Sequence, residues 1–117
     1  MLGVDNCIFC KIVRSEMPAT LLYEDSEIIA FRDIYPAAPT HIQVIPRQHI
    51  QSADDADETN AALFGKLIVV AAKIAKEQGF AGDGYRLITN VGTNGGQHVP
   101  HVHIHILAGR RLSWPPG

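Results

Sequence analysis

The stretch of sequence that decides the fold is HVHIHI, residues 101–106. Histidine and aliphatic residues alternate through it, and this period of two predicts a β-strand with one buried face. Val102, Ile104 and Ile106 then face a core, and the histidines form a row on the other face. Alternate residues of a strand lie about 6.6–6.8 Å apart, so the row is about 13 Å long and one metal ion cannot bind all its rings. The row therefore predicts two adjacent tasks, a ligand at one end and a catalytic group further along.

A glycine-rich stretch, NVGTNGGQ at residues 90–97, comes shortly before the row. Gly92, Gly95 and Gly96 let main-chain N–H groups approach an anion closely. A glycine-rich loop alone is more often an ordinary turn, but beside a row of imidazoles it predicts a phosphate site. Imidazole titrates near pH ~6.5, so it serves as a nucleophile when neutral and as a phosphate donor when protonated.

The other apolar patterns predict an α+β fold with a five-stranded, mostly antiparallel sheet, one long helix and one short helix. The strands are expected at residues 20–24, 28–32, 41–45, 85–89 and 101–106. The short helix is expected over residues 8–16, because Met17-Pro18 would end it there.

The spacing of four aliphatic residues predicts the long amphipathic helix. They are Leu63, Leu67, Val70 and Ile74. The acidic stretch at residues 52–58 suits the start of this helix through capping and the macrodipole, and Gly79 would end it. The apolar seam is longer than so small a sheet needs for cover, so we expect a homodimer.

The composition limits the class of protein. A length of 117 residues predicts one domain, residues 1–117. A hydrophobic content of 46% with 19% charged residues is ordinary for a globular protein, and a net charge of −2 disfavours a nucleic-acid partner. The longest uncharged apolar run, residues 67–72, is too short for a membrane helix, and no secretory signal is apparent. We therefore expect a cytoplasmic protein with no membrane partner.

The HVHIHI stretch resembles the histidine-triad motif, in which histidines alternate with apolar residues. The chain is similar along nearly its whole length to the nucleotide-binding (Hint) branch of the histidine-triad (HIT) superfamily. Further matches are IFCKI at 8–12, AFRDI at 30–34, APTH at 38–41, GGQ at 95–97 and the tail WPPG at 114–117. The resemblance implies a single HIT domain in a homodimer whose sheet continues across the twofold axis through the long helix and residues 85–90. Trp114 would then reach toward the partner's active site.

The resemblance also implies a role for each polar residue of the site. His103, the middle histidine, is the nucleophile that forms a nucleotidyl-imidazole intermediate at the α-phosphorus. His105 binds the phosphate oxygens beside Asn90 and Gly96, and His41 buttresses the nucleophile.

The same resemblance implies that Asp33 accepts the ribose hydroxyls. The purine would enter an apolar slot formed by Ile8, Phe9, Ile12 and Phe31. Without the resemblance these four side chains would be assigned to an ordinary core. His98 departs from the family, because a small hydroxylated residue is common at this position. It could donate a proton to the leaving amine or only bind a phosphate oxygen.

Two cysteines, Cys7 and Cys10, form a C-x2-C pair. In a reducing cytosol such a pair is more often a metal or redox site than a disulfide, although two thiols can also pack as small hydrophobic groups. With His49 and His101 they form a donor set suited to tetrahedral zinc, and some bacterial relatives are similar in carrying zinc at these positions. Four protein ligands leave no place for a substrate water, so this zinc would be structural.

These residues lead to the hypothesis of an enzyme that hydrolyses purine nucleoside 5′-phosphoramidates, with adenosine preferred, and also acyl adenylates, to an AMP-type monophosphate. One alternative is a dinucleoside polyphosphate hydrolase or phosphorylase, since Val99-Pro100 is similar to that neighbouring branch, although the tail with Trp114 argues against it. The other alternative is a regulatory protein that binds a nucleotide without catalysis.

Overall fold

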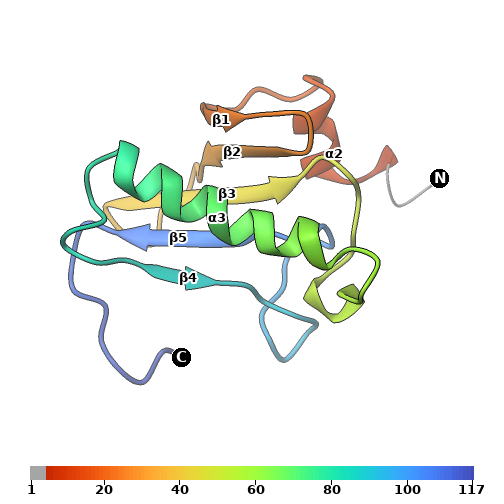
Figure 1. Cartoon of the computed structure of the whole chain (residues 1–117). Helices are drawn as coiled ribbons and strands as arrows, with labels where there is room; N and C mark the ends of the chain where they lie inside the picture. The colour runs from red at the N-terminus through yellow and green to blue at the C-terminus, as the bar shows by residue number, and fades with distance from the viewer. Residues whose placement is uncertain (1–4) are drawn as a thin grey trace.

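Antiparallel strands form one sheet in the spatial order β1-β2-β3-β5-β4 (Figure 1). The structure is a computed structural model that describes residues 5–117. The strands are β1 (Leu21–Glu24), β2 (Ile28–Arg32), β3 (Thr40–Pro46), β4 (Arg86–Ile88) and β5 (Ile104–Ala108). One long and one short α-helix cover the sheet, so the predicted α+β fold is confirmed.

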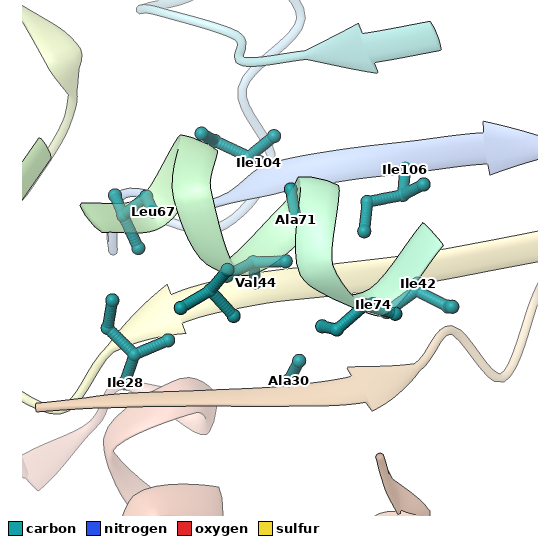
Figure 2. Close-up of a cluster of buried hydrophobic side chains, with 10 residues drawn as sticks. Ile28, Ala30, Ile42, Val44, Leu67, Ala71, Ile74, Ile104 and Ile106 are labelled. Atoms are coloured by element: carbon teal, nitrogen blue, oxygen red, sulfur yellow. The ribbon is translucent and has the colours of Figure 1, made fainter. Parts of the chain in front are cut away.

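The long helix, α3 (Ala61–Glu77), crosses one face of the sheet and contacts β3 and β5. Figure 2 shows aliphatic side chains of β2, β3 and β5 meeting those of the helix, among them Leu67 and Ile74. Each fully buried aliphatic side chain contributes about 1.5–3 kcal/mol to folding. The apolar seam thus covers the sheet of its own chain, so its length does not by itself indicate a dimer, and the homodimer stays a prediction. Within the described residues, no helix is long and apolar enough to cross a membrane.

The short helix, α2 (Ile8–Val13), packs on the opposite face of the sheet, where Phe9 and Cys10 are buried against β2 and β3. It ends earlier than the predicted residue 16. Ser15 adopts the left-handed conformation with a φ of 60°, and the Glu16 N–H donates to the Lys11 carbonyl at 2.8 Å. These are the features of a Schellman motif, which satisfies the last carbonyls and ends the helix before Met17-Pro18 is reached.

The acidic stretch at residues 52–58 does not begin the long helix. Ser52 caps a separate 3-10 turn, η1 (Ala53–Asp55), and the Asp55 carboxylate accepts from the Ser52 N–H in a capping box. Ala56 then becomes extended, with a ψ of 133°, and breaks the turn from α3. The acidic stretch therefore does contain a cap, but the cap belongs to η1 and not to α3 as the sequence predicted.

β5 begins at Ile104 rather than at residue 101. Its ladder with β3 runs from the pair Val44 and Ile104 to the pair Thr40 and Ala108. Beyond Val44 the ladder approaches Pro46, which has no N–H to donate. Residues 101–103 lie outside the ladder, where the His101 N–H donates to the Val99 carbonyl at 2.8 Å and the Val102 N–H to the Ile50 carbonyl at 2.6 Å. Only the last histidine of the row lies within the strand. β4 is likewise shorter than the predicted 85–89.

Candidate active site

A cavity of about 550 Å³ lies on the sheet face that α2 partly covers. All the residues expected to bind the nucleotide line this cavity: Ile8, Phe9, Ile12, Phe31, Asp33, Asn90, Gly96, His98, His103 and His105. They come from α2, β2, the glycine-rich loop and the histidine row, so the fold gathers segments that are far apart in the sequence. One end of the cavity is apolar, and the other carries the imidazoles.

His103 is held in one orientation by the main chain. Its Nδ1 lies 2.7 Å from the His101 carbonyl oxygen, which can only accept, so Nδ1 carries the proton. The lone pair of a neutral ring is then at Nε2, which has no hydrogen-bond partner among the described residues. The Phe9 and His105 rings pack edge-on against His103, with centroids at 5.1 and 4.8 Å. His103 is thus a neutral, oriented imidazole with a free lone pair.

His105 is held by His41, which is buried beside it and does not line the cavity. The Ala37 N–H donates to His41 Nδ1 at 3.0 Å, so the proton of a neutral His41 is at Nε2. That Nε2–H donates to His105 Nδ1 at 2.8 Å. His105 therefore carries its own proton at Nε2, where it can be donated to a phosphate oxygen. His41 contacts His105 rather than the nucleophile that it was expected to buttress.

Burial keeps these rings neutral. Loss of solvent lowers the pKa of His103 and of His41, although the Asp33 carboxylate opposes the shift in both. The pKa of His105 falls to about 4, mainly because the ring is buried and also because His103 and His41 lie close to it. At neutral pH the site therefore offers an unprotonated imidazole nitrogen beside a neutral donor.

Asp33 directly follows β2 and lines the cavity. Its Oδ1 accepts from the Tyr35 N–H at 2.7 Å, and its Oδ2 accepts from Gln43 Nε2 at 2.6 Å. His41 Nε2 lies 3.5 Å from the same Oδ2. A carboxylate has about four lone-pair positions, so Asp33 retains capacity for substrate hydroxyls.

The glycine-rich loop is shaped by its glycines and by Asn90. A Cβ on Gly95 would overlap the main chain of Val91, and Gly96 has a φ of 77°. Asn90 Nδ2 donates to the Gly95 carbonyl at 2.6 Å and holds the loop at the cavity. This contact gives Asn90 a structural task in addition to the phosphate contact expected for it. His98, further along, is exposed and lines the cavity.

Four residues converge at the other end of the row: Cys7, Cys10, His49 and His101. His101 Nδ1 lies 3.2–3.5 Å from His49 Nδ1 and from both Sγ atoms, and Cys10 Sγ lies 3.3 Å from His49 Nδ1. Tetrahedral zinc, with bonds of about 2.0–2.3 Å, needs ligand atoms about 3.3–3.8 Å apart. His101 Nε2–H donates to the Pro46 carbonyl at 2.8 Å, which leaves the Nδ1 lone pair facing the thiols. This cluster can hold a metal ion.

The thiols of this cluster favour a cation. Burial raises the pKa of Cys10 to about 11, and the neighbouring Cys7 adds to the shift. Burial also lowers the pKa of His101 to about 4, so its ring is neutral, as a ligand must be. A bound metal ion would reverse the penalty on the thiolates.

Comparison with known proteins places these features in a family. The family model of the HIT domain matches residues 14–112. The chain belongs to the HIT family. An uncharacterized HIT-like protein of Synechococcus elongatus is 48% identical over 113 residues, which are 97% of this chain and 98% of that protein.

Two solved HIT structures are similar throughout. A HIT family hydrolase from Legionella pneumophila has a TM-score of 0.93 and 47% identity, covering 96% of this chain and 100% of that one. A histidine triad protein from Clostridium difficile has a TM-score of 0.89 and 47% identity, covering 92% and 94%. The HIT fold expected from the histidine row is therefore confirmed.

Sequence reasoning missed one polar residue of the HIT site, Gln43. It lines the cavity, is 8% exposed and binds Asp33. A signal was available, because Gln43 follows His41 by two residues on β3 and so shares its face, while Ile42 and Val44 face the core. Met17 and Tyr35 also line the cavity from loops whose position the sequence did not indicate.

Proposed function

We propose that this HIT protein is a hydrolase of purine nucleoside 5′-phosphoramidates, with adenosine preferred, and of acyl adenylates, acting through a nucleotidyl-histidine. The observation that carries the proposal is His103, a buried neutral ring whose Nδ1–H is donated to a carbonyl and whose Nε2 is free at the cavity. Such a nitrogen is a nucleophile. The name of the Legionella relative, a HIT family hydrolase, supports hydrolysis as the class of reaction.

The reaction has two displacements. His103 Nε2 attacks the α-phosphorus, the P–N bond breaks, and the amine leaves with a proton that His98 can donate at the open side of the cavity. Water then attacks the phosphorus and gives its proton back to His98, the P–N bond to His103 breaks, and a nucleoside monophosphate is released. His105 Nε2–H and the loop at Gly96 bind phosphate oxygens and stabilise the charge that develops on them.

The remaining cavity residues fit the nucleoside. Phe9 and Phe31, with centroids 5.4 Å apart, form apolar walls together with Ile8 and Ile12, and a flat purine can enter between such groups. Asp33 accepts the ribose hydroxyls. The charged residues among those that line the cavity are Arg32 and Asp33, and most of the others are apolar or uncharged, which suits an uncharged base.

We also propose that Cys7, Cys10, His49 and His101 hold one structural zinc ion. The donor set, the spacing of the donor atoms and the fixed tautomer of His101 support zinc. The ion would join the start of α2 to the segment after β3 and to the histidine row. The catalytic steps use other residues, so zinc supplies stability and position rather than chemistry.

A homodimer is the third part of the proposal. β4 is the outer strand of the sheet, with β5 on one side and an open edge on the other. On α3, Ile68 and Val69 are 48% and 65% exposed, which leaves an aliphatic surface on the side away from the core. A partner related by a twofold axis could cover both. Sedimentation equilibrium at micromolar concentration should give twice the mass of one chain, and a monomer mass would contradict this part.

The test of the activity is a substrate panel. Adenosine and guanosine phosphoramidates, an acyl adenylate and a dinucleoside polyphosphate are compared by kcat/KM, and we expect the adenosine phosphoramidate to be best. A dinucleoside polyphosphate turned over faster would favour the neighbouring HIT branch. Tight AMP binding without turnover of any substrate would favour a regulatory nucleotide-binding protein.

A further inference from the structure

Gln43 is a polar side chain on the sheet at the floor of the cavity. On β3 it lies opposite Phe31 of β2 on one side and opposite His105 of β5 on the other. Phe31 belongs to the proposed base slot and His105 to the proposed phosphate site. Gln43 therefore lies at the level of the sugar that joins base and phosphate.

Asp33 fixes the orientation of the Gln43 amide. Gln43 Nε2 donates to Asp33 Oδ2 at 2.6 Å, and a turn of the amide by 180° would place two acceptors against each other. Gln43 Oε1 consequently points elsewhere, and within residues 5–117 it is the buried side-chain polar atom that has no partner. An unpaired buried acceptor is unfavourable, and methionine would fill a similar volume without one. Gln43 donates a hydrogen bond to Asp33 that methionine could not donate, and this bond offsets the unfavourable burial of Oε1.

Asp33 also has a competing partner. His41 Nε2 lies 3.5 Å from the same Oδ2 that Gln43 holds, while its proton is donated to His105 at 2.8 Å. Without the Gln43 donor, the carboxylate would turn toward the His41 N–H. The ribose would lose its acceptor, and His105 would lose part of the bond that fixes its tautomer. By holding Asp33 Oδ2, Gln43 keeps the carboxylate available to the sugar and leaves the His41 proton to His105.

We propose that Gln43 is a positioning residue that acts through Asp33 and makes the site selective for ribonucleotides. Its amide holds the Asp33 carboxylate where the ribose hydroxyls can be accepted, so nucleotides that lack these hydroxyls gain nothing from it. The inference rests on the proposed function, in which Asp33 binds the ribose.

The test compares AMP with 2′,3′-dideoxy-AMP by calorimetry in the wild type, in Gln43→Met and in the control Ile45→Val. Ile45 lies two residues further on the same face of β3 and packs with Phe9 and Phe31 in an apolar cluster. In Gln43→Met we expect the Kd of AMP to rise about tenfold and the Kd of the dideoxy nucleotide to stay within twofold. Ile45→Val should change both equally or neither. Equal losses for both nucleotides in Gln43→Met, or no loss for AMP, would overturn the proposal.

A double-mutant cycle with Asp33→Asn tests the route of the effect. If Gln43 acts through the carboxylate, Gln43→Met should add less than twofold to the Kd of AMP in the Asp33→Asn background. A further tenfold loss there would overturn the positioning role. The melting temperature of Gln43→Met should equal or exceed that of the wild type, because an unpaired acceptor has been removed.

Binding measurements also separate this inference from the proposed activity. A wild type that binds AMP in preference to the dideoxy nucleotide but hydrolyses no phosphoramidate overturns the activity and leaves Gln43 testable. A ribose preference that survives in Gln43→Met overturns the role of Gln43 alone. A wild type that binds neither nucleotide overturns both.

Discussion

The two ends of the histidine row carry clusters of similar composition that suit different chemistry. One end holds Cys7, Cys10, His49 and His101, and the other holds Asp33, His41 and His105. In each cluster the possible ligand atoms lie within 4.8 Å of one another. By residue type and distance alone, both are candidate metal sites.

Main-chain partners distinguish them. The Pro46 carbonyl takes the Nε2 proton of His101 and leaves Nδ1 unprotonated toward the thiols. The Ala37 N–H occupies Nδ1 of His41 and places the proton at Nε2, the atom that faces the cluster. A nitrogen that carries a proton cannot bind a metal ion. The first cluster can therefore bind a metal ion with His101 as it stands, whereas the second is a hydrogen-bonded chain that ends at the cavity.

The largest loss of activity is expected for substitution of His103, which lies between the two clusters in the histidine row. We expect His103→Ala to lose at least a thousandfold in kcat for an adenosine phosphoramidate, because the covalent route is removed, and still to bind AMP. Added imidazole should partly restore turnover in His103→Gly. Rapidly quenched wild type should show a nucleotidyl adduct on His103 by mass spectrometry. An adduct on another histidine, or more than about a tenth of the activity in His103→Ala, would refute this assignment.

The next prediction concerns the metal end. Protein purified without chelator should contain about one zinc per chain, and Cys10→Ser should lose the zinc together with about 3 kcal/mol of stability, while turnover remains measurable at low temperature. Wild type stripped of metal is the control, because it should unfold as easily as Cys10→Ser. A second tightly bound zinc per chain that is lost in His41→Ala would mean that the cluster of Asp33, His41 and His105 also binds a metal ion, and would contradict the distinction between the two clusters.

The sequence predicted what depends on local pattern. Alternation predicted the strands, and the resemblance of the histidine row predicted His103 and His105 as residues of one site, which both line the cavity. Cysteine spacing pointed to the cluster that can hold a metal ion. Features that depend on contacts between distant segments could not be predicted from the sequence. The proton positions of His41 and His101 follow from Ala37 and Pro46, and the role of Ser52 follows from an extended residue after its turn. Alternation on β3 could have placed Gln43 on the cavity face, but its contact with Asp33, in the loop after β2, depends on the tertiary fold.

A smaller effect is expected at the hydrogen-bonded end. His105→Ala removes one donor to the phosphate and should lower kcat about a hundredfold, with little change in AMP affinity. His41→Ala leaves the His105 donor in place and only removes the hydrogen bond that orients its ring, so we expect kcat to fall about tenfold. A loss in His41→Ala as large as that in His105→Ala would mean that His41 does more than orient its neighbour.

The smallest predicted effect is a pH dependence that belongs to this end alone. The pKa of His105 is about 4 in the folded chain, against an ordinary value of about 6.5, because the ring is buried. Between these values the unfolded chain binds more protons, so the free energy of unfolding should fall as the pH is lowered from about 6.5 toward 4. The ring keeps some solvent contact, so we expect about 1 kcal/mol from this residue. Urea unfolding of zinc-loaded wild type and His105→Asn at pH 7 and pH 5 measures it, since asparagine does not titrate and the variant should lose less stability on acidification. In both zinc-loaded proteins the bound ion would keep His101 unprotonated. An equal loss of unfolding free energy in wild type and His105→Asn would therefore assign the acid sensitivity to other groups, and the two clusters would not differ in their response to pH.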